Sequence, residues 1–418
     1  MSVFQYKNGT LHAEDVLLEQ IAEEFGTPTF VYSKKAIVDA YQNFHNAFSS
    51  HDHLICYSVK ANSNLGVLGL FSQMGAGFDI VSGGELQRVL EAGGKPQKIV
   101  FSGVGKQEWE INLALEVGIG CFNLESVSEL RLLSRLATTA NKTARISLRV
   151  NPDVDPKTHP YISTGLKENK FGIPMVEAVS IYQEADGLDS IKVEGVDFHI
   201  GSQITELSPF ADTMIRILEL VDDLEKINIS LSHIDLGGGL GITYDDETPV
   251  DVEEYASSIL QAMGNRPQKL LFEPGRIFVG NAGLLLTRAT TLKENGDKNF
   301  VVVDAAMNDL IRPALYQAWQ RIESVAETGG ELKTVDVVGP VCESSDFLGK
   351  DRLLSVKEGD LLAIHSAGAY GFGMSSNYNS RNRAAEVIVS GDQSYCVRRR
   401  ETIADQLRLE STLPSGFY

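Results

Sequence analysis

Short apolar segments alternate with segments of helical periodicity from residue 36 to residue 273 of this chain. The apolar segments have the length of buried strands. We expect strands at 54–59, 78–81, 98–102, 120–123, 145–150, 193–198, 232–236 and 270–273, with helices between them such as 84–92, 108–116, 127–137 and 252–263. Eight strand–helix units in about 240 residues match a (β/α)8 barrel, although an open doubly wound sheet uses the same alternation. The number of units favours the barrel.

The chain on either side of this region does not continue the strand–helix alternation. Near the start, helical spacing over 14–25 is followed by Gly26 and by a strand-like segment at 29–32. After residue 276, Gly, Asn and Asp turns separate strand-like segments, and 294–297 is a hairpin signal. We therefore predict a barrel over 36–273 and a mostly β domain formed by 1–35 together with 274–418. The strands expected after the barrel are 277–280, 284–290, 300–304, 334–338, 360–364, 385–390 and 395–398.

The composition argues against several kinds of partner. The formal net charge is −19 and the pI is about 4.9, which disfavours nucleic acid or an anionic membrane surface. The start shows no basic and apolar leader, and no apolar run is long enough to span a bilayer. The four cysteines are far apart and lack metal-like spacing, so we expect no metal and a reduced, cytoplasmic setting.

The strand-like segment at 54–59 ends on Lys60. A lysine at a strand end is most often a solvated surface residue. Here the preceding run is apolar on both faces, which is typical of a parallel sheet buried on both sides. Partial burial disfavours the ammonium form and makes the neutral amine available for Schiff-base chemistry. Lys60 is therefore a candidate nucleophile.

Polar residues occur at the ends of all the predicted strands. They are Lys60, Ser82, Ser102, Asn123, Asn151, His199, Gly237–Gly239 and Glu273, with Arg276 close behind. The active site of a (β/α)8 barrel lies at the end of the barrel where the strands terminate. Some of these residues, such as Ser82 and Asn123, are also ordinary turn formers. The pattern predicts a functional site at this end of the barrel.

Two loops offer groups for an anionic, ring-containing ligand. Gly237, Gly238 and Gly239 allow the backbone to approach a ligand and to point N–H groups at an anion, although a tight turn without a ligand fits equally well. In the second loop, Glu273 either pairs with Arg276 or holds a ring nitrogen protonated, which leaves the arginine to bind an acid.

Single residues elsewhere are ambiguous when taken alone. His199 is either a packed core group or an imidazole that stacks on a flat ring. Arg312 and Tyr316 offer a guanidinium and a phenol, but Arg312 alone would pass for a surface charge. Cys342, which precedes Glu343, would pass for a small buried hydrophobe. No Ser-His-Asp arrangement stands out.

Taken together, the motifs resemble the fold-type III pyridoxal-phosphate-dependent decarboxylases over nearly the whole chain. The most specific segments are 57–62 (Tyr-Ser-Val-Lys-Ala-Asn), 149–152 with 170–172, 198–203, 273–276, 307–316, 342–344 and 376–381. The loop 151–171 contains Pro, Gly and His and suits a lid. Two departures are Gln320, where the family often has His, and His365-Ser366, where an acid is common.

The resemblance implies a role for each matching position. Lys60 would bind pyridoxal 5'-phosphate covalently, and Cys342 would donate a proton. The cofactor would be held by Lys60, His199, Ser202, Gly238, Gly239, Glu273, Gly275, Arg276 and Tyr370. The substrate would be held by Arg276, Arg312, Tyr316, Glu343 and Tyr370. The family also implies a homodimer in which Cys342 and Glu343 complete the partner's site, so that the β domain serves closure and dimerisation.

Within the family, the residues favour members that convert meso-2,6-diaminopimelate to L-lysine and CO2, the last step of lysine biosynthesis. Arg276 and Arg312 suit the distal carboxylate of that substrate, and Glu343 suits its distal amine. Decarboxylases of arginine, ornithine or carboxynorspermidine remain alternatives, although arginine and ornithine have no distal carboxylate. A racemase is disfavoured by Glu273. A non-catalytic regulator would tolerate the loss of Lys60 and Cys342, yet both are present.

Overall fold

The structure is a computed structural model that describes residues 3–152, 170–327 and 329–416. Contacts divide the chain into two compact units, Val38–Phe278 and Met1–Ile37 with Val279–Tyr418. The division into functional domains after residues 35 and 273 stays a prediction. Most of the loop 151–171 lies outside the described residues.

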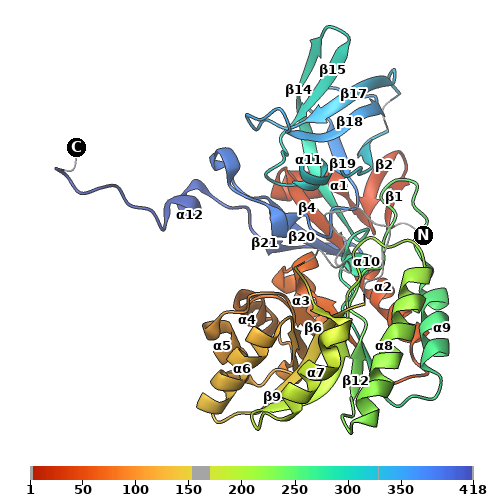
Figure 1. Ribbon diagram of the computed structural model, residues 1–418. Helices are drawn as coiled ribbons and strands as arrows, with labels where there is room; N and C mark the ends of the chain where they lie inside the picture. Colours follow the sequence, from red (N-terminus) through yellow and green to blue (C-terminus); the bar gives the residue numbers. More distant parts are fainter. Residues whose placement is uncertain (1–2, 153–169, 328, 417–418) are drawn as a thin grey trace. The chain divides into compact units, whose positions relative to one another are not determined.

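The unit Val38–Phe278 is a closed parallel barrel (Figure 1). Its eight strands are β5 (His53–Ser58), β6 (Gly77–Ile80), β7 (Ile99–Phe101), β8 (Cys121–Leu124), β9 (Ala144–Asn151), β11 (Ile191–Asp197), β12 (His233–Asp235) and β13 (Lys269–Phe272). Each pairs in parallel with the next, β13 pairs with β5, and β8 pairs with β9. The predicted barrel is confirmed, and this closure excludes the open sheet. Each strand begins and ends within two residues of its predicted position.

Helices connect the barrel strands, and several begin at a side-chain cap. Asn64, Ser82, Ser126 and Asp251 each accept a hydrogen bond from a backbone N–H in the first turn of the following helix. The connecting helices are α2 (Lys34–Ala47), α3 (Leu65–Gln73), α4 (Gly83–Glu91), α5 (Glu108–Val117), α6 (Val127–Thr139), α7 (Met175–Asp186), α8 (Ser208–Lys226) and α9 (Val252–Met263), with short elements η1 (Val59–Ala61), η2 (Pro96–Lys98) and β10 (Ile173–Pro174).

The other unit is mostly β structure, as predicted. A three-stranded sheet contains β1 (Phe4–Lys7), β2 (Thr10–Ala13) and β3 (Val16–Leu17). A larger sheet contains β4 (Thr29–Ser33), β14 (Gly283–Asn295), β15 (Lys298–Val303), β16 (Ile322–Ser324), β17 (Lys333–Val338), β18 (Phe347–Leu354), β19 (Leu361–Ile364), β20 (Ala385–Ser390) and β21 (Gln393–Arg398). The N-terminal β4 pairs with β14 and β20, which confirms that the strand near residue 30 joins this domain.

The helical elements of this unit are short. They are α1 (Leu18–Phe25), α10 (Arg276–Val279, which begins in the barrel unit), α11 (Arg312–Tyr316), α12 (Ile403–Leu407), η3 (Phe372–Met374) and η4 (Tyr378–Ser380). The expected hairpin is present, because residues 296 and 297 form the turn between β14 and β15. The core between α1 and the strands contains Leu18, Ile21, Val31, Leu284 and Val387.

Two expected elements were wrong. Residues 277–280 were expected to form a strand, but the segment begins with α10, because Pro274-Gly275 turns the chain and the N–H of Phe278 donates to the carbonyl of Gly275. The helix expected over 14–25 begins only at Leu18, because Val16–Leu17 pairs with β2 instead. A four-residue apolar run fits a strand or a helical turn, so only its tertiary partners decide between them.

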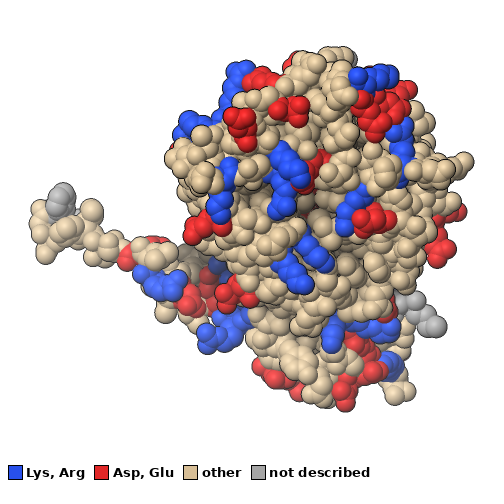
Figure 2. All heavy atoms as spheres, turned by 90° about the horizontal axis from the view of Figure 1, so that it is seen from below, with Lys and Arg blue, Asp and Glu red and all other residues tan. Residues whose placement is uncertain are grey.

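No helix among the described residues is long and apolar enough to cross a membrane. On the face shown in Figure 2, acidic and basic side chains are interspersed.

Candidate active site

Lys60 lies in η1, directly after β5, and its ammonium is paired. Its Nζ lies 2.9 Å from Oδ2 of Asp79, which also accepts a 2.7 Å hydrogen bond from Ser58. The parallel register of β5 and β6 places Ser58 opposite Asp79. The Asp79 side chain is fully buried, while the Lys60 side chain is 40% exposed. Lys60 is therefore held at the end of the barrel by a buried carboxylate and is not a freely solvated lysine.

The loop after β13 packs against the segment that carries Lys60. The N–H of Ser58 donates to the carbonyl of Pro274 at 3.1 Å. A Cβ on Gly275 would lie 2.8 Å from the Cβ of Ala61, so only glycine fits this approach without a shift. The loop 273–276 and Lys60, which are more than 200 residues apart in sequence, thus meet at one end of the barrel.

Glu273 is buried and hydrogen bonded. Its Oε1 accepts from the hydroxyl of Ser102 at 3.0 Å and from the amide of Asn123 at 3.1 Å. Burial raises the pKa of Glu273 well above its ordinary value, nearby carboxylates raise it further, and the charge of Lys60 opposes the shift. Ser102 and Asn123 thus have a role beyond that of turn formers, whereas Ser82 caps α4.

Two further carboxylates adjoin Glu273. Oxygen atoms of Asp197, Asp235 and Glu273 all lie within 4.8 Å of one another, and all three residues are buried. Burial raises the pKa of Asp235 to about 7 and that of Asp197 well above its ordinary value. Three carboxylates at this spacing do not all ionise, so the cluster retains protons near neutral pH. The expectation from the sequence that this protein binds no metal remains a prediction.

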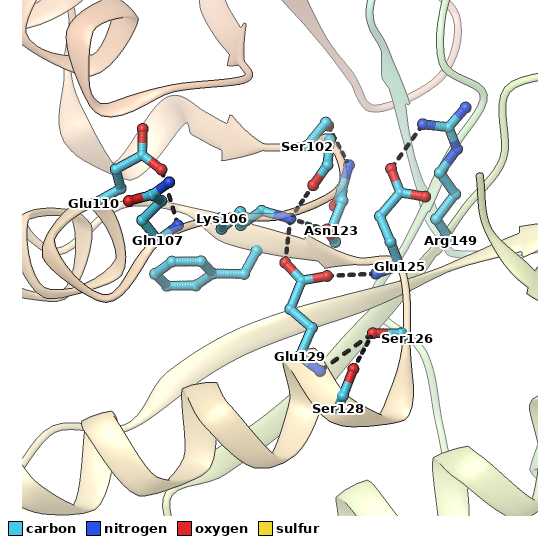
Figure 3. Close-up of polar contacts among 12 residues, drawn as sticks. Ser102, Lys106, Gln107, Glu110, Asn123, Glu125, Ser126, Ser128, Glu129 and Arg149 are labelled. Atoms are coloured by element: carbon cyan, nitrogen blue, oxygen red, sulfur yellow. Dashed lines mark hydrogen bonds and ion pairs between the residues drawn. The ribbon is translucent and has the colours of Figure 1, made fainter. Parts of the chain in front are cut away.

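Buried ion pairs surround the neighbouring strand ends (Figure 3). Nζ of Lys106 lies 2.6 Å from Glu129, and it also donates to the carbonyl of Asn123 at 2.7 Å. Arg149 pairs with Glu125 at 2.9 Å, and Glu125 also accepts from the N–H of Gly172 at 2.7 Å. These contacts fix the backbone at the ends of β8 and β9.

His199 and the glycine loop also lie together. The N–H of Gly238 donates to Nδ1 of His199 at 3.3 Å. Burial lowers the pKa of His199 well below its ordinary value, and the charges of Arg149 and Lys60 lower it further, so the imidazole is neutral at pH 7. A Cβ on Gly238 would lie 2.5 Å from the carbonyl oxygen of Glu273. The glycines are therefore required for close backbone packing, whether or not a ligand is bound.

Arg276 is buried and reaches the loop that follows β11. Its guanidinium donates to the hydroxyl of Ser202 at 2.9 Å and to the hydroxyl of Tyr244. The barrel unit thus gathers an amine, a carboxylate, a neutral imidazole, a guanidinium and a glycine loop.

Several other candidate residues belong to the β unit. Arg312 begins α11, is only 8% exposed, and lies with its guanidinium carbon 5.9 Å from the ring centroid of Tyr316. It is therefore not a surface charge. Cys342 is exposed rather than buried, so it is not a small core hydrophobe. Its N–H donates to the side chain of Asn379 at 2.9 Å, and Tyr378 donates to Glu343. Tyr370 has a positive φ of 55°.

The two departures from the family pattern contact each other. The amide nitrogen of Gln320 donates to the carbonyls of His365 at 2.9 Å and Ser366 at 3.0 Å. The His365 ring in turn contacts Glu323 at 2.6 Å. Both departures belong to one packing arrangement within the β unit.

Sequence reasoning missed three buried aspartates of the site. Asp79, Asp197 and Asp235 each lie inside or at the end of a barrel strand between apolar residues. The repeated pattern apolar–Asp–apolar was a usable signal, because an isolated carboxylate in a buried strand is costly and so requires a partner.

Known proteins resemble this chain along most of its length. A family model described as "Pyridoxal-dependent decarboxylase, pyridoxal binding domain" matches residues 34–280. The chain is 56% identical over 414 residues to the diaminopimelate decarboxylase of Pseudomonas aeruginosa, covering 99% of this chain and 100% of that protein.

Two solved structures are also similar. Diaminopimelate decarboxylase from Helicobacter pylori, complexed with L-lysine, matches with a TM-score of 0.91 and 42% identity over 94% of this chain and 98% of that one. The enzyme from M. jannaschii, in co-complex with L-lysine, matches with a TM-score of 0.94 and 37% identity over 98% of each chain.

Proposed function

Since this chain belongs to the pyridoxal-dependent decarboxylases, we propose that it converts meso-2,6-diaminopimelate to L-lysine and CO2. The similarity to diaminopimelate decarboxylases over nearly the full length supports this substrate. The main structural observation is that Lys60, Glu273, His199 and the glycine loop come together at the C-terminal end of one closed barrel. The reaction is the last step of lysine biosynthesis.

The residues at the end of the barrel fit pyridoxal 5'-phosphate. A lysine amine suits its aldehyde, a buried carboxylate suits its ring nitrogen, and backbone N–H groups with a guanidinium suit its phosphate. When bound, the cofactor supplies an electron sink for the bond that breaks as CO2 leaves. The residues assigned to hold it are Lys60, His199, Ser202, Gly238, Gly239, Glu273, Gly275, Arg276 and Tyr370.

Glu273 would hold a proton at the ring nitrogen of the bound cofactor. Ser102 and Asn123 donate to its Oε1 and so fix the orientation of the carboxylate. His199 presents a neutral imidazole, because burial disfavours its protonation. Such a ring packs against a flat ligand without adding charge.

The substrate is bound through charge-matched groups. Arg276 and Arg312 bind the distal carboxylate, Glu343 binds the distal amine, and Tyr316 and Tyr370 contribute hydroxyl groups. Cys342 would serve as the proton donor of the reaction. Its exposure leaves the thiol accessible for this role.

We further propose a homodimer in which Cys342 and Glu343 complete the partner's site. In it the domain 36–273 binds the cofactor, and the domain 1–35 with 274–418 serves closure and dimerisation. The acidic composition supports an enzyme without a nucleic-acid or membrane partner. The cysteine pattern supports a cytoplasmic setting.

The decisive experiment combines a spectrum with a lysine-release assay. The purified chain should bind pyridoxal phosphate with absorbance near the edge of the visible range and should release lysine from meso-diaminopimelate. Lys60→Ala should remove both signals, whereas Lys95→Ala, at an exposed position of the same unit, should retain them. Arginine and ornithine serve as competing substrates. Turnover of either in place of meso-diaminopimelate, or an unchanged spectrum in Lys60→Ala, would refute the assignment.

A further inference from the structure

The motif 376–381 has no role in the proposed chemistry, yet its backbone is unusual. Asn379 has φ 54° and ψ 29°, and Ser380 has φ 53°. The left-handed region costs most residues free energy, and asparagine is among the side chains that tolerate it best. A turn held in this conformation by its surroundings is a candidate for a positioning device.

This turn contacts both candidate residues of the 342–344 motif. Oδ1 of Asn379 accepts a 2.9 Å hydrogen bond from the N–H of Cys342, 37 residues away in sequence. The hydroxyl of the adjacent Tyr378 donates to Oε1 of Glu343. One contact holds the backbone beside the thiol, and the other holds a carboxylate.

The turn is itself anchored to a third motif. The N–H of Ser376 donates to the carbonyl of Asn308 at 2.9 Å, and the side chain of Asn308 returns a bond to the carbonyl of Ser376 at 3.3 Å. Nε of Arg381 donates to Oδ1 of Asn308 at 3.1 Å. Asn308 is only 2% exposed and lies in the segment 307–316 that leads to Arg312. Both ends of the turn are therefore fixed to buried structure.

The segment around Cys342 is fixed on its other side by Asp346. Oδ2 of Asp346 accepts from the N–H of Val341 at 2.7 Å, and Oδ1 accepts from the N–H of Met307 at 2.7 Å. Cys342 and Glu343 are exposed and therefore have little packing to define their position. Asn379 supplies a contact to the backbone N–H of Cys342, and Tyr378 supplies one to the side chain of Glu343.

We propose that two residues of this turn are positioning residues: Asn379 positions the thiol of Cys342, and Tyr378 positions the carboxylate of Glu343. The roles of that thiol and that carboxylate rest on the proposed function. Because the two contacts are separate, the two residues act on separate parts of the reaction. Loss of the Asn379 contact disturbs the proton donor, and loss of the Tyr378 contact disturbs recognition of the distal amine.

The geometric part is tested by hydrogen exchange at the Cys342 amide in the cofactor-loaded chain. Asn379→Gly removes the acceptor but permits the same backbone conformation, and the exchange rate of this amide should rise about tenfold, as expected for the loss of one hydrogen bond. Asn379→Asp retains an acceptor oxygen and should leave the rate within about twofold of the original. An unchanged Cys342 rate in Asn379→Gly overturns the role of Asn379.

The kinetic part separates positioning from general destabilisation. Asn379→Gly should lower kcat for meso-diaminopimelate about tenfold with little change in KM, because the proton donor acts after binding. Tyr378→Phe keeps the ring, loses the hydroxyl, and should raise KM about tenfold with little change in kcat. If both variants change kcat and KM together, the positioning roles are wrong. If the unchanged protein releases no lysine, the proposed function fails, and the exchange result alone decides whether Asn379 holds Cys342.

Discussion

The buried carboxylate cluster makes the stability of the cofactor-free protein depend on pH. Asp235 ends β12, its side chain is fully buried, and burial raises its pKa from 3.8 to about 7. In the unfolded chain the same group ionises near its ordinary value. The folded state therefore keeps a proton that the unfolded state has lost. The resulting stability is fully present below the unfolded pKa and is lost as the pH rises through about 7.

The size of the effect follows from the window between the two pKa values. From pH 5 to pH 7 the folded state binds one proton more than the unfolded state, and each pH unit is worth about 1.36 kcal/mol. Asp235 alone should therefore lower the free energy of unfolding by about 2.7 kcal/mol between pH 5 and pH 8. Asp197 and Glu273 have raised pKa values as well and act in the same direction. Asp235→Asn mimics the protonated acid and should remove the contribution of this residue.

The assay is urea unfolding of the cofactor-free protein and of Asp235→Asn at pH 5 and pH 8, with far-UV circular dichroism as the signal. Depressed histidine pKa values, such as that of His233 at about 4, act in the opposite direction and cancel in the comparison of the two proteins. Asp52→Asn, at an exposed side chain of the same unit, is the matched control. Equal losses of stability from pH 5 to pH 8 in the original protein and in Asp235→Asn would refute the assignment of a bound proton to Asp235.

Three further predictions concern the ion pairs, the substrate and the assembly. Lys106→Met leaves Glu129 buried without its cation and should destabilise the barrel by about 3–5 kcal/mol in chemical denaturation, whereas Arg131→Ala, in an exposed pair with Glu184, should destabilise it far less. Similar losses in both variants would contradict this difference. Arg312→Ala should raise KM for meso-diaminopimelate at least about tenfold, and unaltered saturation would exclude its contact with the carboxylate. Mixed Lys60→Ala and Cys342→Ala chains should recover roughly a quarter of the activity if each site in a symmetric dimer uses both chains. No recovery after proven subunit exchange would indicate self-contained protomers.

Local sequence patterns were sufficient for most of the fold. The eight barrel strands were predictable because each is a short apolar run bounded by helical periodicity. The sequence also identified Lys60, Glu273 and the glycine loop as groups at strand ends. It failed at 277–280, where a four-residue apolar run fits two kinds of structure, and at 14–17, where pairing with β2 overrides helical spacing.

The candidate site was predictable only in part, because its contacts join residues far apart in the chain. Ser102 and Glu273 are 171 residues apart, and no local pattern shows that a serine hydroxyl will meet that carboxylate. Barrel closure turns one face of each strand inward, and only this closure brings together the buried carboxylates of Asp79, Asp197 and Asp235. The link between Asn379 and Cys342 is of the same kind.

The sequence by itself therefore determined which segments become strands and helices, and which strand ends carry reactive groups, because those properties depend on residues within a few positions of one another. Only the tertiary structure decided which buried carboxylates share protons and which exposed residues are held by a neighbouring turn. Those properties depend on distances between side chains across the fold, and an electrostatic or hydrogen-bonding contact of a few ångströms leaves no periodic trace in the order of the amino acids.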